Sequence, residues 1–265
     1  MTDTTTLKTC VITGASSGLG VELALEVAGT LDFTDLVLSA RRRERMEELA
    51  VRLRERKPGL GIHIVCADLS APDGVATLFD GLGDLLPTVG MWINNAGFGF
   101  RGPFIGQEPA DLDRMIDVDV RALMQCTRRI LPSMIARRDG RILNISSVAA
   151  FSPIPWFAVY AASKAFVLSF SEALAHELAG TGVTVTAFCP GPMPTEFFDI
   201  AGKTRWHGPS VLWISPEKAA RQAITATLAG QAVHIPQKLF VLETFLARLS
   251  PRGLISAVSG RIFKD

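Results

Sequence analysis

The sequence predicts an α/β fold in which a doubly wound, seven-stranded parallel sheet carries helices on both faces. Short β-branched apolar runs alternate with longer segments of helical periodicity along the chain. These runs are hydrophobic throughout, which is typical of strands that are buried on both faces. Polar, glycine-containing segments follow several of them, and ligands of such sheets bind at the carboxyl ends of the strands.

The expected elements follow one another without an internal repeat or a low-complexity linker. Strands are expected at residues 10–13, 35–39, 62–66, 91–95, 141–146, 183–189 and 232–236. Helices are expected at about 18–29, 42–57, 71–82, 110–137, 158–179 and 216–229. With 265 residues, of which 48% are hydrophobic, the chain is long enough for one large core, so we expect a single domain over residues 1–265.

Composition argues against several other classes of protein. A net charge of +1 gives no general field for nucleic acid, and the basic run at 41–57 is interleaved with glutamates, as on a solvated helix face. The N-terminus lacks a signal-peptide pattern, and the uncharged stretch at 142–163 is broken by prolines. The four cysteines show no CxxC pairing. We expect a cytoplasmic protein without a metal site, a nucleic-acid partner or membrane association.

The segment after the first strand is expected to bind the pyrophosphate of a dinucleotide. It has the sequence TGASSGLG at residues 13–20, and its glycines let the backbone turn tightly and approach a phosphate at the start of the following helix. The glycine spacing differs by one residue from the standard dinucleotide fingerprint. We expect cofactor contacts from Gly14, Ser16, Ser17, Gly18, Leu19 and Gly20.

The end of the second strand favours NADP(H) as the cofactor. No acidic residue stands there to hydrogen-bond a ribose 2′-hydroxyl, whereas Arg41 and Arg42 can contact a 2′-phosphate or simply open an exposed helix. After the third strand, Asp68 can accept a hydrogen bond from the adenine amino group or act as the N-cap of the next helix. Further cofactor contacts are expected from Leu69, Asn95, Ala96 and Gly97.

The only tyrosine of the chain, Tyr160, lies four residues before Lys164. On a helix the two side chains share one face, so the ammonium favours the phenolate and is expected to lower the pKa of the phenol. Such a pair is a usable acid and base at physiological pH. Ser147 ends the fifth strand, where its hydroxyl can hydrogen-bond a carbonyl oxygen while Tyr160 donates a proton.

Together these motifs resemble the short-chain dehydrogenase/reductase family. The shared features are TGxxxGxG at 13–20, NNAG at 94–97, a serine thirteen residues before YxxxK at 160–164, and CPGPMPTEF at 189–197, which is similar to the PG-loop of the family. The resemblance covers about residues 8–200. It implies a Rossmann fold and hydride transfer between NAD(P)(H) and a carbonyl or alcohol carbon. Within the family, the chain is most similar to a broad group of bacterial NADP(H)-preferring oxidoreductases.

The resemblance also implies roles for single residues. Ser147 would polarise the substrate oxygen, Tyr160 would be the acid and base, and Lys164 would hold the nicotinamide ribose. Cofactor contacts are further implied for Asn94, Pro190, Gly191 and Thr195. A small-molecule carbonyl or alcohol substrate and a homodimer or homotetramer are the implied partners.

Asp119 departs from the family pattern. The family has a catalytic asparagine in a run such as D-V-N-V, where this chain reads IDVDVRAL. That asparagine usually lies at a helix kink. There it holds, largely through its backbone, a water that relays protons from the lysine to bulk solvent. An aspartate can preserve this geometry and adds a negative charge near Lys164, so we include Asp119 among the catalytic residues. The departure is also the one feature that favours an alternative, a dinucleotide-binding regulatory or interaction protein with weakened turnover.

Aromatic residues cluster where the family has its substrate pocket. Apolar walls around few polar groups suit an apolar or aromatic carbonyl substrate, although ordinary core packing explains some of these residues equally well. Substrate contacts are expected from Phe98, Phe151, Trp156, Phe197 and Trp206. Segment 194–214 is expected to be a mobile lid. The amphipathic run 238–265 is expected to form a helical extension that packs on a partner subunit, covers the site or lies on a membrane surface.

Overall fold

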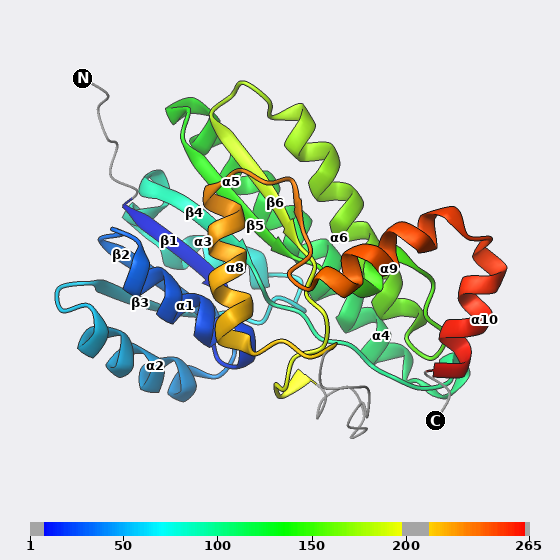
Figure 1. Cartoon of the computed structure of the whole chain (residues 1–265). Coiled ribbons are helices and arrows are strands. Elements are labelled where there is room, and N and C mark those ends of the chain that lie inside the picture. Colours follow the sequence, from blue (N-terminus) through cyan, green and yellow to red (C-terminus); the bar gives the residue numbers. More distant parts are fainter. Residues whose placement is uncertain (1–7, 198–211, 263–265) are drawn as a thin grey trace.

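The computed structural model describes residues 8–197 and 212–262 and has the predicted doubly wound architecture (Figure 1). Its seven-stranded sheet runs in the order β3-β2-β1-β4-β5-β6-β7, and all neighbouring strands are parallel. The strands are β1 (Thr9–Thr13), β2 (Asp35–Ala40), β3 (Gly61–Cys66), β4 (Val89–Asn94), β5 (Gly140–Ile145), β6 (Val183–Phe188) and β7 (Val233–His234). Strand order reverses between β1 and β4, which is where ligands bind in sheets of this type.

Helices cover both faces of the sheet, as predicted (Figure 1). Alternate side chains of β1 divide between the two layers, because Cys10 and Ile12 pack with one group of helices and Val11 packs with the other. The first group is α1 (Gly18–Thr30), α2 (Arg43–Arg56) and α8 (Pro216–Leu228). The second is α3 (Gly74–Leu82), α5 (Leu123–Arg137) and α6 (Ala158–Glu177). Burial on both faces explains why the strands are apolar throughout.

The long helix predicted at 110–137 is interrupted in the structure. It consists of α4 (Pro109–Ile116), a π-helical stretch at Asp117–Ala122, and α5. Short π-helical segments inside an α-helix often mark functional sites. Here the stretch contains Asp119, whose side chain is buried. Short 3₁₀ segments also occur, for example at Gly83–Thr88, Phe104–Gly106 and Val148–Phe151.

The predicted C-terminal extension forms two helices, α9 (Lys238–Leu249) and α10 (Arg252–Ile262). Large apolar side chains are exposed on both helices, namely Leu239, Val241, Leu242, Phe245, Leu246, Leu249, Leu254 and Val258. None of the helices within the described ranges is long and apolar enough to span a membrane. Most of the predicted lid, at 198–211, lies outside the described residues, so the lid remains a prediction.

Candidate active site

A cavity of about 650 Å³ opens at the carboxyl ends of the strands. It extends from the glycine loop after β1 to the N-terminal part of α6 and to the C-terminal helices. Its volume is that of a typical ligand site. Most of the expected cofactor residues line it, namely Gly14, Ser16, Ser17, Gly18, Leu19, Arg41, Arg42, Asp68, Leu69, Asn95, Ala96, Gly97, Tyr160, Lys164, Pro190, Gly191 and Thr195, and so does Ser147.

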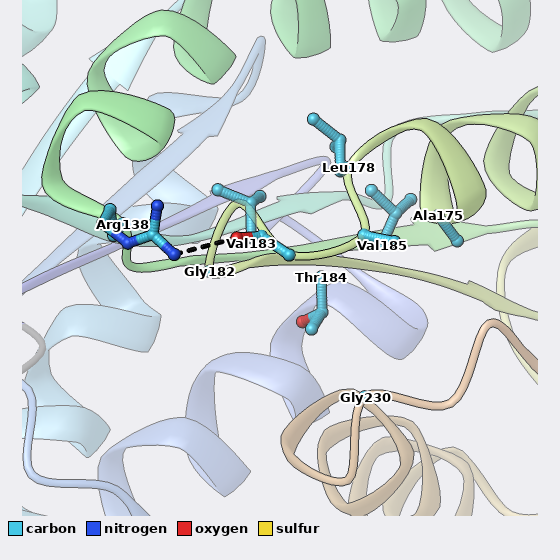
Figure 2. A pocket seen from close by; sticks show the side chains of 10 residues that line it. Arg138, Ala175, Leu178, Gly182, Val183, Thr184, Val185 and Gly230 are labelled. Atoms are coloured by element: carbon cyan, nitrogen blue, oxygen red, sulfur yellow. Dashed lines mark hydrogen bonds between the residues drawn. The ribbon is translucent and has the colours of Figure 1, made fainter.

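A second cavity, of about 470 Å³, lies at the opposite edge of the sheet, around the first residues of β6 (Figure 2). Arg138 donates a hydrogen bond to the carbonyl of Gly180 there, at 2.9 Å. It is the one ionisable side chain in the described wall of this cavity, alongside small and aliphatic residues such as Val183 and Thr184. Without an acid and a base, this cavity offers no proton-transfer chemistry, so the candidate active site is the first cavity.

The glycine loop has the close backbone approach that a dinucleotide cradle requires. Gly14 has φ +67°, and a Cβ at this position would lie 2.7 Å from the Cα of Ala96. A Cβ on Gly20 would collide with the carbonyl oxygen of Gly14. The side-chain amide of Asn95 donates to the carbonyls of Thr13 and Gly14, at 2.9 and 3.1 Å, and so holds the loop against the end of β4. These features fit a nicotinamide dinucleotide, whose pyrophosphate the loop and the start of α1 would hold.

Asn94 does not reach the cavity, in contrast to what the family resemblance implied. Asn94 is the last residue of β4, and its side chain is buried in the core. There it accepts a hydrogen bond from the Trp92 indole at 2.7 Å. It also donates to Thr127 and Asn144, at 3.0 and 2.8 Å. Asn94 therefore ties strands and helices together in the core, and the neighbouring Asn95 lies at the cavity.

Asp68 lines the cavity but is not the N-cap of the next helix, so that alternative was wrong. Helix α3 begins at Gly74 and is preceded by Asp73. The Asp68 carboxylate instead accepts hydrogen bonds from the backbone N–H and the hydroxyl of Ser70, at 3.0 and 2.7 Å. These local bonds fix its carboxylate at the edge of the cavity.

The two arginines expected at a 2′-phosphate both line this end of the cavity. The Arg42 guanidinium contacts the Ser16 hydroxyl through two nitrogens, at 3.3 and 3.2 Å. It also forms an ion pair with Glu196, at 3.0 Å. Because Glu196 is far from Arg42 in the sequence, composition and spacing gave no signal for this contact.

Ser147, Tyr160 and Lys164 come together at the inner end of the cavity. The Lys164 ammonium lies 5.6 Å from the centre of the Tyr160 ring, one turn along α6. Ser147 lies two residues after β5, and its hydroxyl is close enough to the Tyr160 phenol to act on the pKa of that group. The Ser147 oxygen also accepts from the backbone N–H of Ala149, at 3.1 Å, which orients the hydroxyl.

Burial raises the pKa of Tyr160 above its usual value. The Lys164 ammonium and the nearby Ser147 hydroxyl oppose this rise, and the Asp119 carboxylate adds to it. The lysine therefore acts in the direction that the sequence predicts, but the predicted net lowering is wrong. The reason is that removing a phenolate from water costs more than the nearby cation returns.

Asp119 lies behind Lys164 and pairs with it. Its Oδ2 is 3.0 Å from the lysine nitrogen, and the two side chains are 0% and 7% exposed. The other carboxylate oxygen accepts from the backbone N–H of Phe98 at 3.1 Å, and Ser163 donates to Oδ2 at 3.4 Å. Burial acts to lower the pKa of Lys164, but the Asp119 carboxylate and the Tyr160 phenol outweigh it, so the pKa is raised. Lysine is thus held as an ammonium beneath the tyrosine.

Two of the expected substrate residues lie in the cavity wall, and two do not. Phe98 and Phe197 line it, and the Phe197 ring centre is 5.3 Å from that of Tyr160. Phe151 and Trp156 are absent from the wall within the part of the chain that the structure describes, so contact of either residue with a substrate stays a prediction. Trp206 lies outside the described residues.

Trp156 and Phe151 contact the C-terminal helices instead of the cavity. Trp156 has φ +70° and donates its indole N–H to the carbonyl of Gly260 in α10, at 3.4 Å. The Arg248 guanidinium of α9 lies over the Phe151 ring, 5.9 Å from its centre. The sequence missed the cavity residues that these helices provide, which are Leu239, Phe240, Glu243 and Ser259. Their one signal was the amphipathic pattern that indicated a cover for the site.

A parallel sheet with a glycine cradle at its switch point, and a buried serine and lysine with a half-buried tyrosine at the same edge, defines an oxidoreductase that binds a nicotinamide dinucleotide. The family profile described as short chain dehydrogenase matches residues 8–206. The chain belongs to the short-chain dehydrogenase/reductase family.

Relatives in this family include reductases and alcohol dehydrogenases. A sulfoacetaldehyde reductase from Chromohalobacter salexigens is 40% identical over 89% of this chain and 88% of its own. A short-chain dehydrogenase from Sphingobium yanoikuyae, solved in complex with NADPH, is 32% identical with a TM-score of 0.82, and the match covers 93% of this chain and 94% of that one. A bulky-bulky ketone specific alcohol dehydrogenase from Comamonas testosteroni is 30% identical with a TM-score of 0.78, over 94% of both chains.

Proposed function

We propose that the protein is an NADP(H)-dependent oxidoreductase that interconverts a carbonyl group and a primary or secondary alcohol on an apolar or aromatic small molecule. The observation that carries this proposal is the joint position of Ser147, Tyr160 and Lys164 in one cavity that also contains the glycine cradle. The class of reaction corresponds to an alcohol dehydrogenase acting with NADP(H) as acceptor or donor.

The proposed mechanism divides the work between the cofactor and the chain. The dinucleotide, when bound, supplies or accepts the hydride. For reduction, the hydroxyls of Ser147 and Tyr160 hold the carbonyl oxygen, and Tyr160 transfers its proton to that oxygen as the carbonyl carbon is reduced. Lys164 stabilises the resulting phenolate, and Asp119 keeps the lysine charged. Oxidation of the alcohol uses the same groups in reverse.

Several observations support the finer parts of the proposal. Arg41 and Arg42 follow β2 without an acidic residue, which favours NADP(H), and the Sphingobium relative was solved with NADPH. Apolar residues from three parts of the chain wall the cavity around Tyr160, which favours an apolar substrate. We also propose a cytoplasmic homodimer or homotetramer in which residues 194–214 form a lid and residues 238–265 cover the site.

A decisive experiment replaces the phenolic hydroxyl alone. We expect Tyr160→Phe to lower the turnover of carbonyl substrates by about 10³- to 10⁴-fold, because it removes the proton donor. Binding of NADPH, followed by thermal shift, should remain. Turnover that survives in Tyr160→Phe would overturn the mechanism. An NADH efficiency equal to or above that of NADPH would overturn the cofactor preference.

A dinucleotide-binding protein without turnover is the second candidate function. The observation that favours it is the carboxylate of Asp119 at the position of the family asparagine. This candidate predicts that NADPH stabilises the wild-type protein while no carbonyl or alcohol in a broad panel is turned over in a Tyr160-dependent way.

A further inference from the structure

Residues 195–197, which follow β6, connect three parts of the cavity. Thr195 packs on the glycine loop, since a Cβ on Gly18 would lie 3.2 Å from the Thr195 Cβ. Phe197 packs on the ring of Tyr160. Between them, Glu196 reaches across the cavity mouth to Arg42. One short segment thus contacts the cradle, the expected 2′-phosphate site and the proton donor.

Glu196 forms an ion pair with the guanidinium of Arg42, which is the group expected to bind the 2′-phosphate of NADP(H). Its Oε2 lies 3.0 Å from Nη1 of Arg42, while the other two nitrogens of Arg42 contact Ser16. Its Oε1 faces Arg45, at 3.9 Å. The Arg42 and Glu196 side chains are 44% and 39% exposed, and ion pairs with such exposure are weak enough to be exchanged for another anion.

We propose that Glu196 is a cofactor-specificity residue that competes with the 2′-phosphate of NADP(H) for Arg42. The inference rests on the proposed NADP(H) preference. A phosphate group is a stronger partner for a guanidinium fork than an exposed carboxylate, so it displaces Glu196 but binds less tightly than it would to an uncommitted Arg42. NAD(H) carries no 2′-phosphate and leaves the Arg42–Glu196 pair in place. Glu196 therefore narrows the difference in affinity between the two dinucleotides.

The test uses two probes that differ only by the 2′-phosphate, adenosine 2′,5′-bisphosphate and adenosine 5′-monophosphate, in titration calorimetry of the full chain. We expect Glu196→Gln to tighten binding of the bisphosphate by about two- to fivefold and to leave the monophosphate unchanged. The matched control is Glu47→Gln, which removes the same charge from an exposed pair with Arg43 on the same helix as Arg45 and should change neither affinity. In an Arg42→Ala background, Glu196→Gln should lose its effect.

The outcomes separate this inference from the proposed function. If wild-type protein prefers the bisphosphate and Glu196→Gln leaves the ratio of the two affinities unchanged, the role of Glu196 is overturned while the cofactor preference stands. If wild-type protein shows no preference but Glu196→Gln creates one, the role of Glu196 is supported and the proposed NADP(H) preference fails. If neither protein prefers the bisphosphate, both are overturned.

Discussion

The two sides of the cavity differ in how firmly they are attached to the protein core. On the catalytic side, the side chains of Asp119, Ser147 and Lys164 are buried, and each is hydrogen-bonded to or paired with a neighbouring residue. The opposite side comes from α9 and α10, where large apolar side chains such as Leu242, Phe245 and Leu254 are exposed. The difference suggests that the buried groups beside the sheet determine the reaction, whereas the more exposed helices α9 and α10 select the substrate.

The largest expected effect tests the difference in packing. Leu23 of α1 is fully buried in the core, whereas Leu249 at the end of α9 is 71% exposed. We expect Leu23→Ala to lower the free energy of unfolding by about 3 kcal/mol, and Leu249→Ala to change it by less than about 0.5 kcal/mol. Urea denaturation of both variants measures this. A loss at Leu249 as large as that at Leu23 would show that α9 is covered in solution, by a second subunit or another partner.

A smaller effect is expected from the substrate wall. Phe240 packs against Gly191 and lines the cavity, while Leu246 on the same helix is exposed. We expect Phe240→Ala to raise the KM for an apolar ketone about tenfold by removing apolar contact area, with little change in kcat. Leu246→Ala is the matched control and should leave the KM unchanged. A fall in kcat with unchanged KM in Phe240→Ala would mean that α9 contributes to the reaction itself. The division between a catalytic side and a substrate-selecting side would then be wrong.

The smallest expected effect concerns the charge behind Lys164. Burial is the main cause of the raised pKa of Tyr160 and persists in Asp119→Asn, but the contribution of the carboxylate disappears. Tyr160 still favours the protonated form of Lys164 in this variant, so the pKa of the phenol should fall, and alcohol oxidation, which requires the phenolate, should reach its plateau at lower pH. The measurement is a pH–rate profile of each protein. Asp117→Asn, which removes a carboxylate paired with Arg121, is the control. Profiles of Asp119→Asn and wild type that superimpose at equal rates would show that the charge plays no part in proton transfer.

Most of the fold was predictable because it depends on local patterns. Strands buried on both faces leave continuous apolar runs, and the glycines of the loop leave a fixed spacing, so the sheet and the cradle could be located from the sequence. Composition and periodicity gave no sign of the π-helical stretch at Asp117–Ala122, because its residues keep the composition of an ordinary helix, and only the family resemblance implied a helix kink at Asp119. The direction of the pKa shift of Tyr160 could not be predicted either, because it depends on the burial of the phenol, which residue spacing does not reveal.

The substrate side was harder to predict because it depends on contacts between distant segments. Trp156 and Phe151 stand close to Tyr160 in the sequence, and this favoured a place in the pocket. Gly260 and Arg248 draw them toward the C-terminal helices instead. The Arg42–Glu196 pair joins residues 154 positions apart, and neither residue signals the other. Sequence patterns thus locate the groups that face the core more readily than those that close the cavity.

The presence of a single tyrosine gives this chain a built-in spectroscopic reporter. In most proteins, ultraviolet absorption by ionised phenols sums over many side chains and cannot be assigned. Here every phenolate signal comes from the oxygen of Tyr160, which lies beside Ser147. A simple absorbance titration of the unlabelled protein therefore follows one proton at the candidate active site, and it can be repeated with each dinucleotide bound.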